Sequence, residues 1–356
     1  MGKRLGGDAN AIPGADIFGT YWNGVSPSRF VLGWICLQFL VLIRISYPGL
    51  PNLLLSATHL VTLSLDDIPH SGYISPEAIV TAVSTLASLE HLSLKFESPR
   101  SRPDWENRRL PPPTRSVLPV LAAFRFKGVC EYLEDVVTRI TAPRLDALYI
   151  TLFNQIVFDT PQFIQFISSS PTLETFEKAY VVFGVDAAKV YLPQRVYLGS
   201  QTSNSGGLNM RIPCIELDWQ VSSMEQVFTS CLPPLFTLED IYIYEDPNPP
   251  PVWQDNIDNT LWLELLRPFT GVKNLYLSEK FASHTIPALL ELTGGRMTDV
   301  LPNLQNIFLE ELQSSTVQAG LQQSVATRQV TVHPIAVSRW DDSSQVIGNK
   351  LRYLFH

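Results

Sequence analysis

Residues 60–65, Leu-Val-Thr-Leu-Ser-Leu, and residues 89–94, Leu-Glu-His-Leu-Ser-Leu, share the spacing that decides the fold. An apolar residue is followed by two variable residues, a second apolar residue, one variable residue and a third apolar residue. Because side chains alternate between the two faces of a strand, the second and third apolar residues of each copy point to the same face. The spacing recurs at Leu60/Leu63/Leu65, Leu89/Leu92/Leu94, Leu121/Phe124/Phe126, Leu145/Leu148/Ile150, Ile212/Ile215/Leu217, Leu238/Ile241/Ile243, Val272/Leu275/Leu277 and Leu304/Ile307/Leu309 and, incompletely, at Leu173/Phe176.

Amphipathic helices are expected between neighbouring strands. Ser75 is placed to cap a helix in which Pro76 is the first residue, and the apolar residues that follow repeat with a helical period. Similar apolar stripes lie in residues 132–140, 160–167 and 262–266. The chain also holds 27 prolines in 356 residues, where an average protein has about 5%, and several of them lie in the joints after these helices. A helix, a tight joint and a strand therefore form the repeating unit.

A unit of this kind cannot cover its own apolar face, so the units are expected to stack. Successive copies start about 30 residues apart, slightly above the roughly 20–29 residues of a leucine-rich repeat. We expect an α/β leucine-rich-repeat solenoid of about nine irregular units over residues 46–340, with a curved parallel sheet inside and helices outside. Residues 1–45 are expected to be an atypical segment that is either poorly ordered or mispredicted, and residues 341–356 a C-terminal tail. The alternative is an unrelated α/β domain, because any half-buried strand alternates apolar and polar residues.

The charge balance and the cysteines limit the class of partner and the compartment. The formal net charge is −8, whereas binding through nucleic-acid phosphates needs a basic face, so no nucleic-acid partner is expected. The apolar run Val31–Ile43 is shorter than the about 20 residues of a membrane span, so no membrane partner is expected. Cys36, Cys130, Cys214 and Cys231 lie far apart without metal-ligand spacing. This pattern indicates reduced structural thiols in an intracellular protein of the cytoplasm or nucleus.

Three segments interrupt the repeat. Residues 98–115 form an Arg/Pro-rich insertion with five arginines and two acidic residues, a local net charge of +3. This insertion is expected to be a solvated surface loop or a loop that docks an acidic protein surface, with a nucleic-acid contact as the weakest alternative. The residues that would dock are Arg100, Arg102, Trp105, Arg108 and Arg109. Residues 198–210 are expected to be a loop or a pause between two stacks, and residues 247–251 a stiff rim loop or a polyproline ligand.

The sequence contains no recognised catalytic motif, so no enzyme activity, cofactor or metal is expected. His59 and His91 lie in adjacent copies, but they differ in phase, so their side chains need not face the same way. Asp66 and Asp67 are typical of surface acids at the end of a strand rather than of a catalytic pair. An enzyme with a pocket at residues 198–210 is the rival class, and a vestigial repeat-only paralogue is a further alternative.

Several blocks carry a family resemblance: Leu50–Leu60, Ile68–Ala78, Phe126–Asp135, Trp262–Leu277 and Val300–Leu312. With the Arg/Pro-rich insertion, they make the chain resemble the leucine-rich-repeat portion of the F-box-like proteins of mushroom-forming fungi. The resemblance implies repeats that hold a protein for ubiquitination, joined to an F-box that engages the adaptor of an SCF-type ubiquitin ligase. Residues 1–45 show no F-box pattern, so adaptor binding is not carried over. The chain is then a truncated member or a repeat-only relative.

The expected function is a non-enzymatic scaffold for protein–protein interaction. It would bind a protein partner on the concave strand face or through the Arg-rich loop, and would form the substrate-recognition part of an SCF-type ubiquitin ligase if a fuller form supplies the F-box. The variable positions of the strands alternate away from the core, and interface anchors are often tyrosines. The anchors expected among them are Tyr149, Tyr242, Tyr244 and Tyr276.

Overall fold

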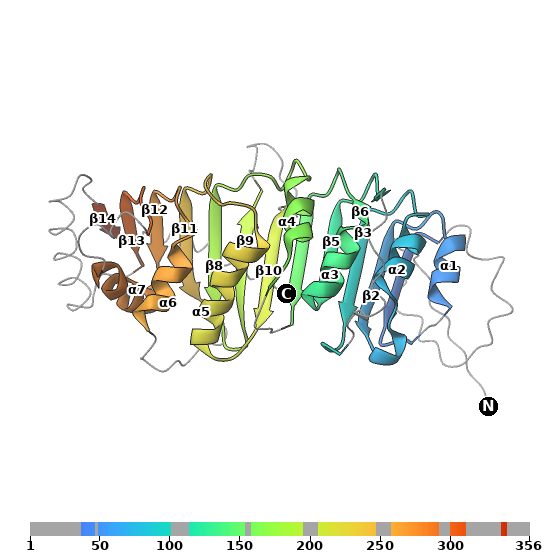
Figure 1. Cartoon of the computed structure of the whole chain (residues 1–356), viewed down its shortest axis with the longest axis horizontal. Coiled ribbons are helices and arrows are strands. Elements are labelled where there is room, and N and C mark those ends of the chain that lie inside the picture. Colours follow the sequence, from blue (N-terminus) through green and yellow to red (C-terminus); the bar gives the residue numbers. More distant parts are fainter. Residues whose placement is uncertain are drawn as a thin grey trace, which may run out of the picture.

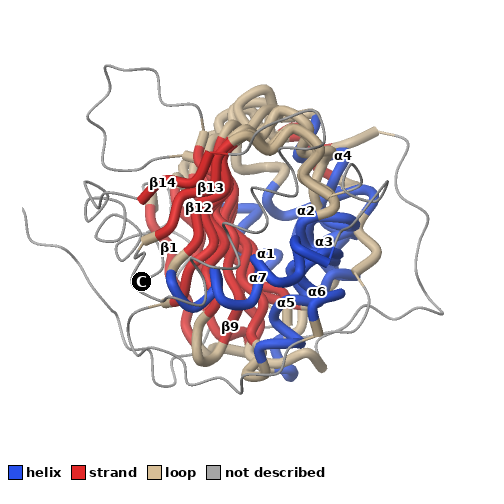
Figure 2. The backbone as a smooth tube through the Cα atoms, turned by 90° about the vertical axis from the view of Figure 1, so that its left-hand side faces the viewer, coloured by secondary structure: helices blue, strands red, loops and turns tan. Residues whose placement is uncertain are grey.

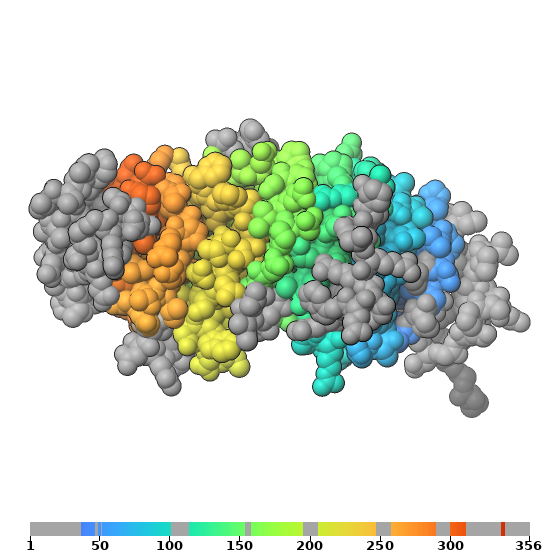
Figure 3. Space-filling view, in the orientation of Figure 1, coloured from blue at the N-terminus to red at the C-terminus, as the bar shows by residue number. Residues whose placement is uncertain are grey.

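The fold is a long sheet with a layer of helices against it. The computed structural model describes residues 37–46, 49–100, 114–153, 158–194, 206–246, 258–291, 300–310 and 336–339. The strands follow one another along the longest axis of the molecule (Figure 1), and the colours of the sequence follow the same axis on the surface (Figure 3). A view turned by 90° separates the strands and the helices into two layers (Figure 2).

The main sheet has twelve strands in the order β1-β2-β3-β5-β7-β10-β9-β8-β11-β12-β13-β14. Most neighbouring strands are parallel, as the repeat predicts. A small second sheet pairs β4 with β6. The strands are β1 (Phe39–Ile43), β2 (Thr62–Ile68), β3 (His91–Phe96), β4 (Ser116–Val117), β5 (Ala123–Gly128), β6 (Ile140–Thr141), β7 (Ala147–Leu152), β8 (Lys178–Phe183), β9 (Ala187–Pro193), β10 (Gly207–Pro213), β11 (Asp240–Glu245), β12 (Asn274–Leu277), β13 (Asn306–Leu309) and β14 (Ala336–Arg339).

The described helices lie on one face of the sheet (Figure 2). The predicted start of α2 is confirmed, because the Ser75 side chain accepts a hydrogen bond from the amide of Ala78 at 3.2 Å and Pro76 is the first helical residue. The helices expected over residues 160–167 and 262–266 are present as α4 and α6, whereas the helix expected over residues 132–140 is present as α3 only to Val137, because Ile140 lies in β6. The helical segments are α1 (Leu50–Ser56), the 3-10 turn η3 (His70–Gly72), α2 (Pro76–Val83), α3 (Cys130–Val137), α4 (Pro161–Ser168), α5 (Leu217–Gln226), the π-helical turn η4 (Val227–Cys231), α6 (Asn259–Leu266) and α7 (Glu279–Glu291).

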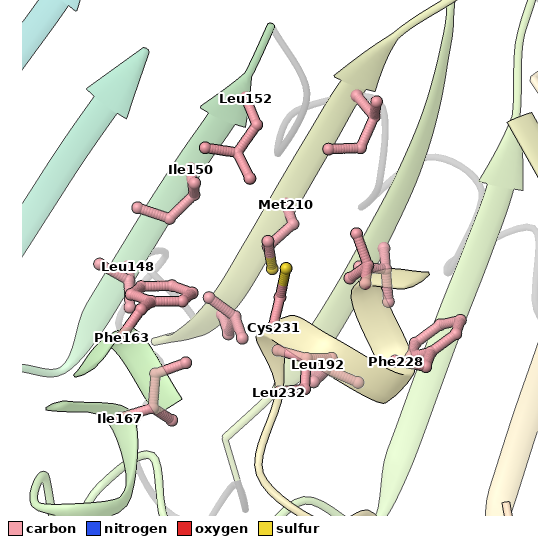
Figure 4. Packing of buried hydrophobic residues seen from close by; sticks show 14 of the residues in the cluster. Leu148, Ile150, Leu152, Phe163, Ile167, Leu192, Met210, Phe228, Cys231 and Leu232 are labelled. Carbon is pink, nitrogen blue, oxygen red and sulfur yellow. The ribbon is translucent and has the colours of Figure 1, made fainter. Parts of the chain in front are cut away.

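The repeated apolar positions make the core between the two layers. Leu63, Leu92, Phe124 and Leu148 lie opposite one another on β2, β3, β5 and β7, and each is at most 2% exposed. Figure 4 shows how Leu148 and its neighbours on β7 and β10 meet side chains from α4 and η4. Since burying one such side chain contributes about 1.5–3 kcal/mol, the recurring spacing is the main source of stability.

The expectation of a sheet that is parallel throughout is wrong at its centre. β9 runs antiparallel to both β8 and β10, and β10 rather than β8 pairs with β7. The cause lies in the connection between β8 and β9, which consists of residues 184–186 and is closed by a hydrogen bond from the Gly184 amide to the Ala187 carbonyl at 2.9 Å. Parallel neighbours need a crossover of about a dozen residues or more, whereas a connection this short joins antiparallel strands.

The copy predicted at Ile212/Ile215/Leu217 is also wrong. Ile212 is buried in β10, but Ile215 is 72% exposed and Leu217 begins α5. Buried Gln220 fixes this turn, because its Nε2 donates to the carbonyls of Gly184 and Cys214 at 2.7 and 2.9 Å. Residues 207–210, which were expected in a loop, belong to β10. Residues 198–205 of that interruption lie outside the described residues.

Part of the N-terminal segment that was expected to be poorly ordered is a strand. Residues 39–43 form β1, which pairs in parallel with β2. Leu40 is 9% exposed and Leu42 packs against the core, whereas Phe39, Val41 and Ile43 on the opposite face are 65%, 54% and 56% exposed. The alternation of a short strand is thus hidden in the apolar run Val31–Ile43, because its solvent-facing residues are apolar too.

Polar contacts tie neighbouring helices together. The buried carboxylate of Glu134 on α3 accepts hydrogen bonds from the amides of Gln162 and Phe163 at 3.0 and 2.7 Å. These amides belong to the first turn of α4 and have no partner within their own helix, so Glu134 caps α4. Arg139, after α3, forms an ion pair with Glu77 of α2 at 2.7 Å. The helix layer is therefore linked from α2 to α4.

Candidate protein-binding face

No described helix covers the second face of the main sheet (Figure 2), and we call it the helix-free face. The pairing register places one side chain from each strand in a single row across this face, because paired residues of neighbouring strands point the same way. From β1 to β14 the row consists of Val41, Ser64, Ser93, Arg125, Tyr149, Asn209, Tyr191, Tyr180, Tyr242, Tyr276, Phe308 and Ser338.

The row is aromatic between β9 and β13. The rings of Tyr191, Tyr180, Tyr242, Tyr276 and Phe308 stack on one another, with successive centroids 6.2, 4.6, 4.1 and 4.5 Å apart. Offset stacking of this kind contributes about 0.5–1.5 kcal/mol per pair beyond the area buried. We call these five residues the aromatic row. It forms a second apolar cluster, on the opposite side of the sheet from the core.

Burial changes the acidity of the tyrosines in the aromatic row. Loss of solvent, followed by the nearby Asp240 carboxylate, raises the pKa of Tyr180 to about 12. The pKa of Tyr242 is also well above its ordinary value, mainly through burial and then through the neighbouring phenols. Tyr242 is only 5% exposed because rings lie against both of its faces. These hydroxyls therefore remain protonated throughout the physiological pH range.

A ladder of polar side chains runs beside the aromatic row, two residues earlier in each strand and therefore on the same face. Lys178 pairs with Asp240 at 3.3 Å. The Asn274 amide donates to Asp240 at 2.7 Å, and the Asn306 amide donates to the Asn274 side-chain oxygen at 2.7 Å. Each hydrogen bond joins adjacent strands from β8 to β13. The ladder fixes the strand register beneath the aromatic rings.

At the other end of the face, a β-bulge turns two acids to the same side. The pairing between β2 and β3 shifts by one residue between Leu65 and Ile68, and Asp67 has a positive φ of 50°. Asp66 consequently accepts from the hydroxyls of Ser64 and Ser93 at 3.0 and 3.2 Å. Both carboxylates lie inside strand β2, not past its end as the sequence suggested.

Basic side chains surround the two carboxylates. Lys95 lies 3.4 Å from Asp66, while Arg44 and Lys127 lie 3.4 and 3.8 Å from Asp67. The exposed Arg125 guanidinium stands over the ring of Tyr149, 4.5 Å from its centroid. The helix-free face is therefore cationic and polar over β2, β3 and β5, and aromatic over β8 to β13.

The predicted anchors fall on this face. Tyr149, Tyr242 and Tyr276 lie in the one row, and Tyr244 lies two residues further along β11. Tyr149, Tyr244 and Tyr276 are half-buried, whereas Tyr242 is buried. Sequence reasoning missed Tyr180, Tyr191, Phe308, Arg125 and Lys127. Alternation along residues 123–128 would have placed the two basic residues of β5 on this face, but the tyrosines of β8 and β9 depend on the unexpected strand order.

The Arg/Pro-rich insertion is described only at its two ends. Arg102, Trp105, Arg108 and Arg109 lie outside the described residues, and Arg100 is exposed at the edge of the described part. Arg115 donates a hydrogen bond to the Gln165 side chain of α4 at 2.9 Å. The end of the insertion thus rests on the helix layer.

Within the described residues, no group of histidine, cysteine, aspartate and glutamate side chains could hold a metal ion. His59 and His91 are exposed. No helix in the described ranges has the length and apolar character needed to cross a membrane. Cys130, Cys214 and Cys231 are buried and form no disulfide bond with one another, while Cys36 lies outside the described residues.

Comparison with known proteins does not assign the chain to a family. No protein-family model matches the sequence, and no curated protein matches it. Among solved structures, this chain is similar to the crystal structure of the leucine-rich repeat-containing protein LegL7 from Legionella pneumophila, with 13% sequence identity and a TM-score of 0.31. The match covers 81% of this chain and 71% of that chain.

Proposed function

We propose that this chain is a non-enzymatic leucine-rich-repeat scaffold that binds a protein partner on the helix-free face of its sheet. The observation that carries the proposal is the single row from Ser64 to Phe308, held in register across neighbouring strands. Tyrosine and arginine are the residues most enriched in the energetic centres of protein interfaces. This row brings Arg125, Tyr149 and the aromatic row together on one continuous surface.

The chemistry of the face favours binding over catalysis. Two serines of the row, Ser64 and Ser93, donate to the Asp66 carboxylate rather than to a histidine, which is the usual base of a serine nucleophile. The carboxylates of Asp66 and Asp240 are engaged by Lys95 and Lys178 across neighbouring strands. Such pairs fix the shape of a surface, as a docking face requires.

A narrower role follows from the family resemblance. We propose that the partner is a protein to be ubiquitinated and that this chain is the substrate-recognition part of an SCF-type ubiquitin ligase. The fungal F-box-like blocks in the sequence support this role. Co-purification tests it: recovery of the ligase adaptor with the tagged chain supports the receptor role, and recovery of other partners without the adaptor contradicts it. The free, buried thiols fit a reducing compartment, and we place the protein in the cytoplasm or nucleus.

Site-specific photocrosslinking tests the proposed function. The photoreactive residue p-benzoylphenylalanine replaces Tyr149 on β7 or Phe308 on β13, both half-buried aromatics of the row. In the matched control it replaces Trp219, which is 51% exposed on α5 in the helix layer. Each variant is irradiated in cells of the source organism, and adducts are identified by mass spectrometry.

The expected result is one shared protein adduct from the Tyr149 and Phe308 positions that the Trp219 position lacks. An adduct that forms equally from the Trp219 position would place the binding surface on the helices. The absence of any protein adduct from all three positions would also contradict the proposal, provided that each variant unfolds at the same temperature as the native chain.

A further inference from the structure

The helix-free face has an unbalanced charge at its β2–β5 end. Arg44, Lys95, Arg125 and Lys127 supply four positive charges there, against the two carboxylates of the bulge. The strands β2, β3 and β5 carry no other acidic residue. These six side chains, which we call the cationic patch, together have a net charge of +2 in a chain whose net charge is −8.

The two carboxylates of the bulge neutralise part of the positive charge of the patch and also hold its lysine side chains in place. Because Asp66 and Asp67 point to the same face, each holds a lysine from a strand further along the sheet, Lys95 on β3 and Lys127 on β5. These lysine side chains remain about one third exposed, at 36% and 34%. Their ammonium groups thus have donors left for a ligand, since each carries three N–H bonds.

Arg125 is the member of the patch that is open to an acidic ligand. Its guanidinium is exposed, lies over the Tyr149 ring and makes no ion pair with any described residue. An arginine held on an aromatic ring loses little further conformational freedom when it binds a carboxylate in the two-pronged geometry. Arg125 is therefore the strongest candidate for recognition.

An exposed apolar strip borders the cationic patch. Phe39, Val41 and Ile43 project from β1 on the helix-free face, each more than half exposed. Ile43 lies opposite Asp66, so the strip and the patch are contiguous. A strip of aliphatic and aromatic side chains in this position gives no contact to a phosphate backbone, but it can bury apolar side chains of a protein.

We propose, building on the proposed function, that the partner presents an acidic segment with interspersed apolar side chains, and that this segment binds the cationic patch and the apolar strip together. From β1 through β2, β3 and β5 to β7 the face crosses four strand spacings of about 4.8 Å, about 19 Å in all, and about six extended residues cover that span. Charge complementarity sets the register of the segment, and the apolar strip adds burial.

Fluorescence anisotropy with labelled peptides of about ten residues tests the inference, because that length covers the span with short flanks. The probe alternates glutamate with leucine. One comparison peptide has lysine in place of glutamate, a second has serine in place of leucine, and a single-stranded oligonucleotide of equal charge tests the nucleic-acid alternative. The full chain is titrated against each probe at low and high salt.

The decisive variant is Arg125→Glu/Lys127→Glu, and its matched control is Arg144→Glu/Arg267→Glu, which changes the net charge equally at exposed residues away from the face. The face variant is expected to weaken binding of the glutamate–leucine peptide about tenfold or more, and the control less than about threefold. If the glutamate pair unfolds the chain, Arg125→Gln/Lys127→Gln replaces it, with an expected loss of about threefold.

Three results would each overturn the inference. The lysine–leucine peptide could bind as tightly as the glutamate–leucine peptide, the oligonucleotide could bind more tightly than it, or the face variant could bind it with unchanged affinity. No binding of any peptide would overturn it as well. These failures differ from failure of the proposed function, because photocrosslinks from Tyr149 and Phe308 to a protein would persist if the partner bound the helix-free face through Tyr149 and the aromatic row without an acidic segment.

Discussion

The phenol rings of Tyr242 and Tyr276 lie 4.1 Å apart and 10° from parallel, on strands that the repeat places side by side. Tyr180 lies against the other face of Tyr242 at 4.6 Å, and Tyr191 lies beside Tyr180 because β9 and β10 are inserted between β7 and β8. The continuous aromatic row is therefore a product of both the regular repeat and its interruption.

The aromatic row predicts a loss of stability at high pH. The pKa of Tyr180 is about 12 in the folded chain and about 10 in an unfolded one, so the folded state holds its proton more tightly. This contribution is fully present below pH 10 and is lost as the pH rises from 10 through 12; its upper limit is about 2–3 kcal/mol. Chemical denaturation at several pH values measures it. A Tyr180→Phe variant should lose less unfolding free energy over that pH interval, and equal losses in the two proteins would contradict the assignment.

The cap on α4 predicts a specific stability cost. Replacing Glu134 by Gln leaves one side-chain oxygen to serve the two amides of Gln162 and Phe163 and removes the charge that interacts with the helix terminus. The expected cost is about 1–3 kcal/mol in urea unfolding. Glu174→Gln, which changes an exposed glutamate, is the control and should change stability by less than about 0.5 kcal/mol. Equal effects would show that Glu134 does not act as a cap.

Gly207 is the first residue of β10 and lies where β10 begins to pair with β7 and β9. It has a φ of +135°, and a Cβ atom there would lie 2.4 Å from the Leu192 carbonyl oxygen. Gly207→Ala should therefore destabilise the chain by about 1–3 kcal/mol or more. Gly184→Ala is the comparison, since its φ is not in the left-handed region and its closest contact would be 3.2 Å. A Gly207→Ala variant as stable as the native chain would contradict the β9–β10 pairing.

The thiols predict slow chemical modification. Burial raises the pKa of Cys214 to about 11 and that of Cys231 to about 12, so little thiolate exists at neutral pH. In a Cys36→Ser variant, an aromatic disulfide reagent should react with less than one thiol per folded chain and with three after denaturation. Rapid reaction of Cys214 or Cys231 in the folded chain would show that the layer of α5 and η4 opens readily.

The local chemistry of the fold could be predicted from the sequence, but the order of the strands could not. Ser75 and Pro76 mark a helix start by themselves, and the apolar spacing around Leu92 marks a buried strand, because both depend only on near neighbours. The apolar spacing that begins at Ile212 does not mark a buried strand after that residue, because the strand that contains Ile212 ends one residue later, at Pro213. Which strand lies beside β7 depends on contacts far apart in the sequence.

The candidate face was predictable to the same extent. Alternation within β7 and β11 correctly placed Tyr149 and Tyr242 away from the core. The bulge at Asp67 and the arrival of Tyr191 beside Asn209 could not be read from spacing, since a positive φ and an antiparallel pairing leave no periodic signal. These two features create the cationic patch and complete the aromatic row.

The central claim is that a protein binds the helix-free face. Its most direct test is the dissociation constant for the purified partner that photocrosslinking identifies, measured by titration calorimetry. The face variant is Tyr149→Ser/Tyr276→Ser. The control is Ile215→Ser/Trp219→Ser, because Ile215 just before α5 is 72% exposed and Trp219 in α5 is 51% exposed. The face variant should weaken binding about tenfold or more, and the control should leave it within about twofold. A face variant that binds as tightly as the native chain, with its unfolding temperature unchanged, would contradict the claim.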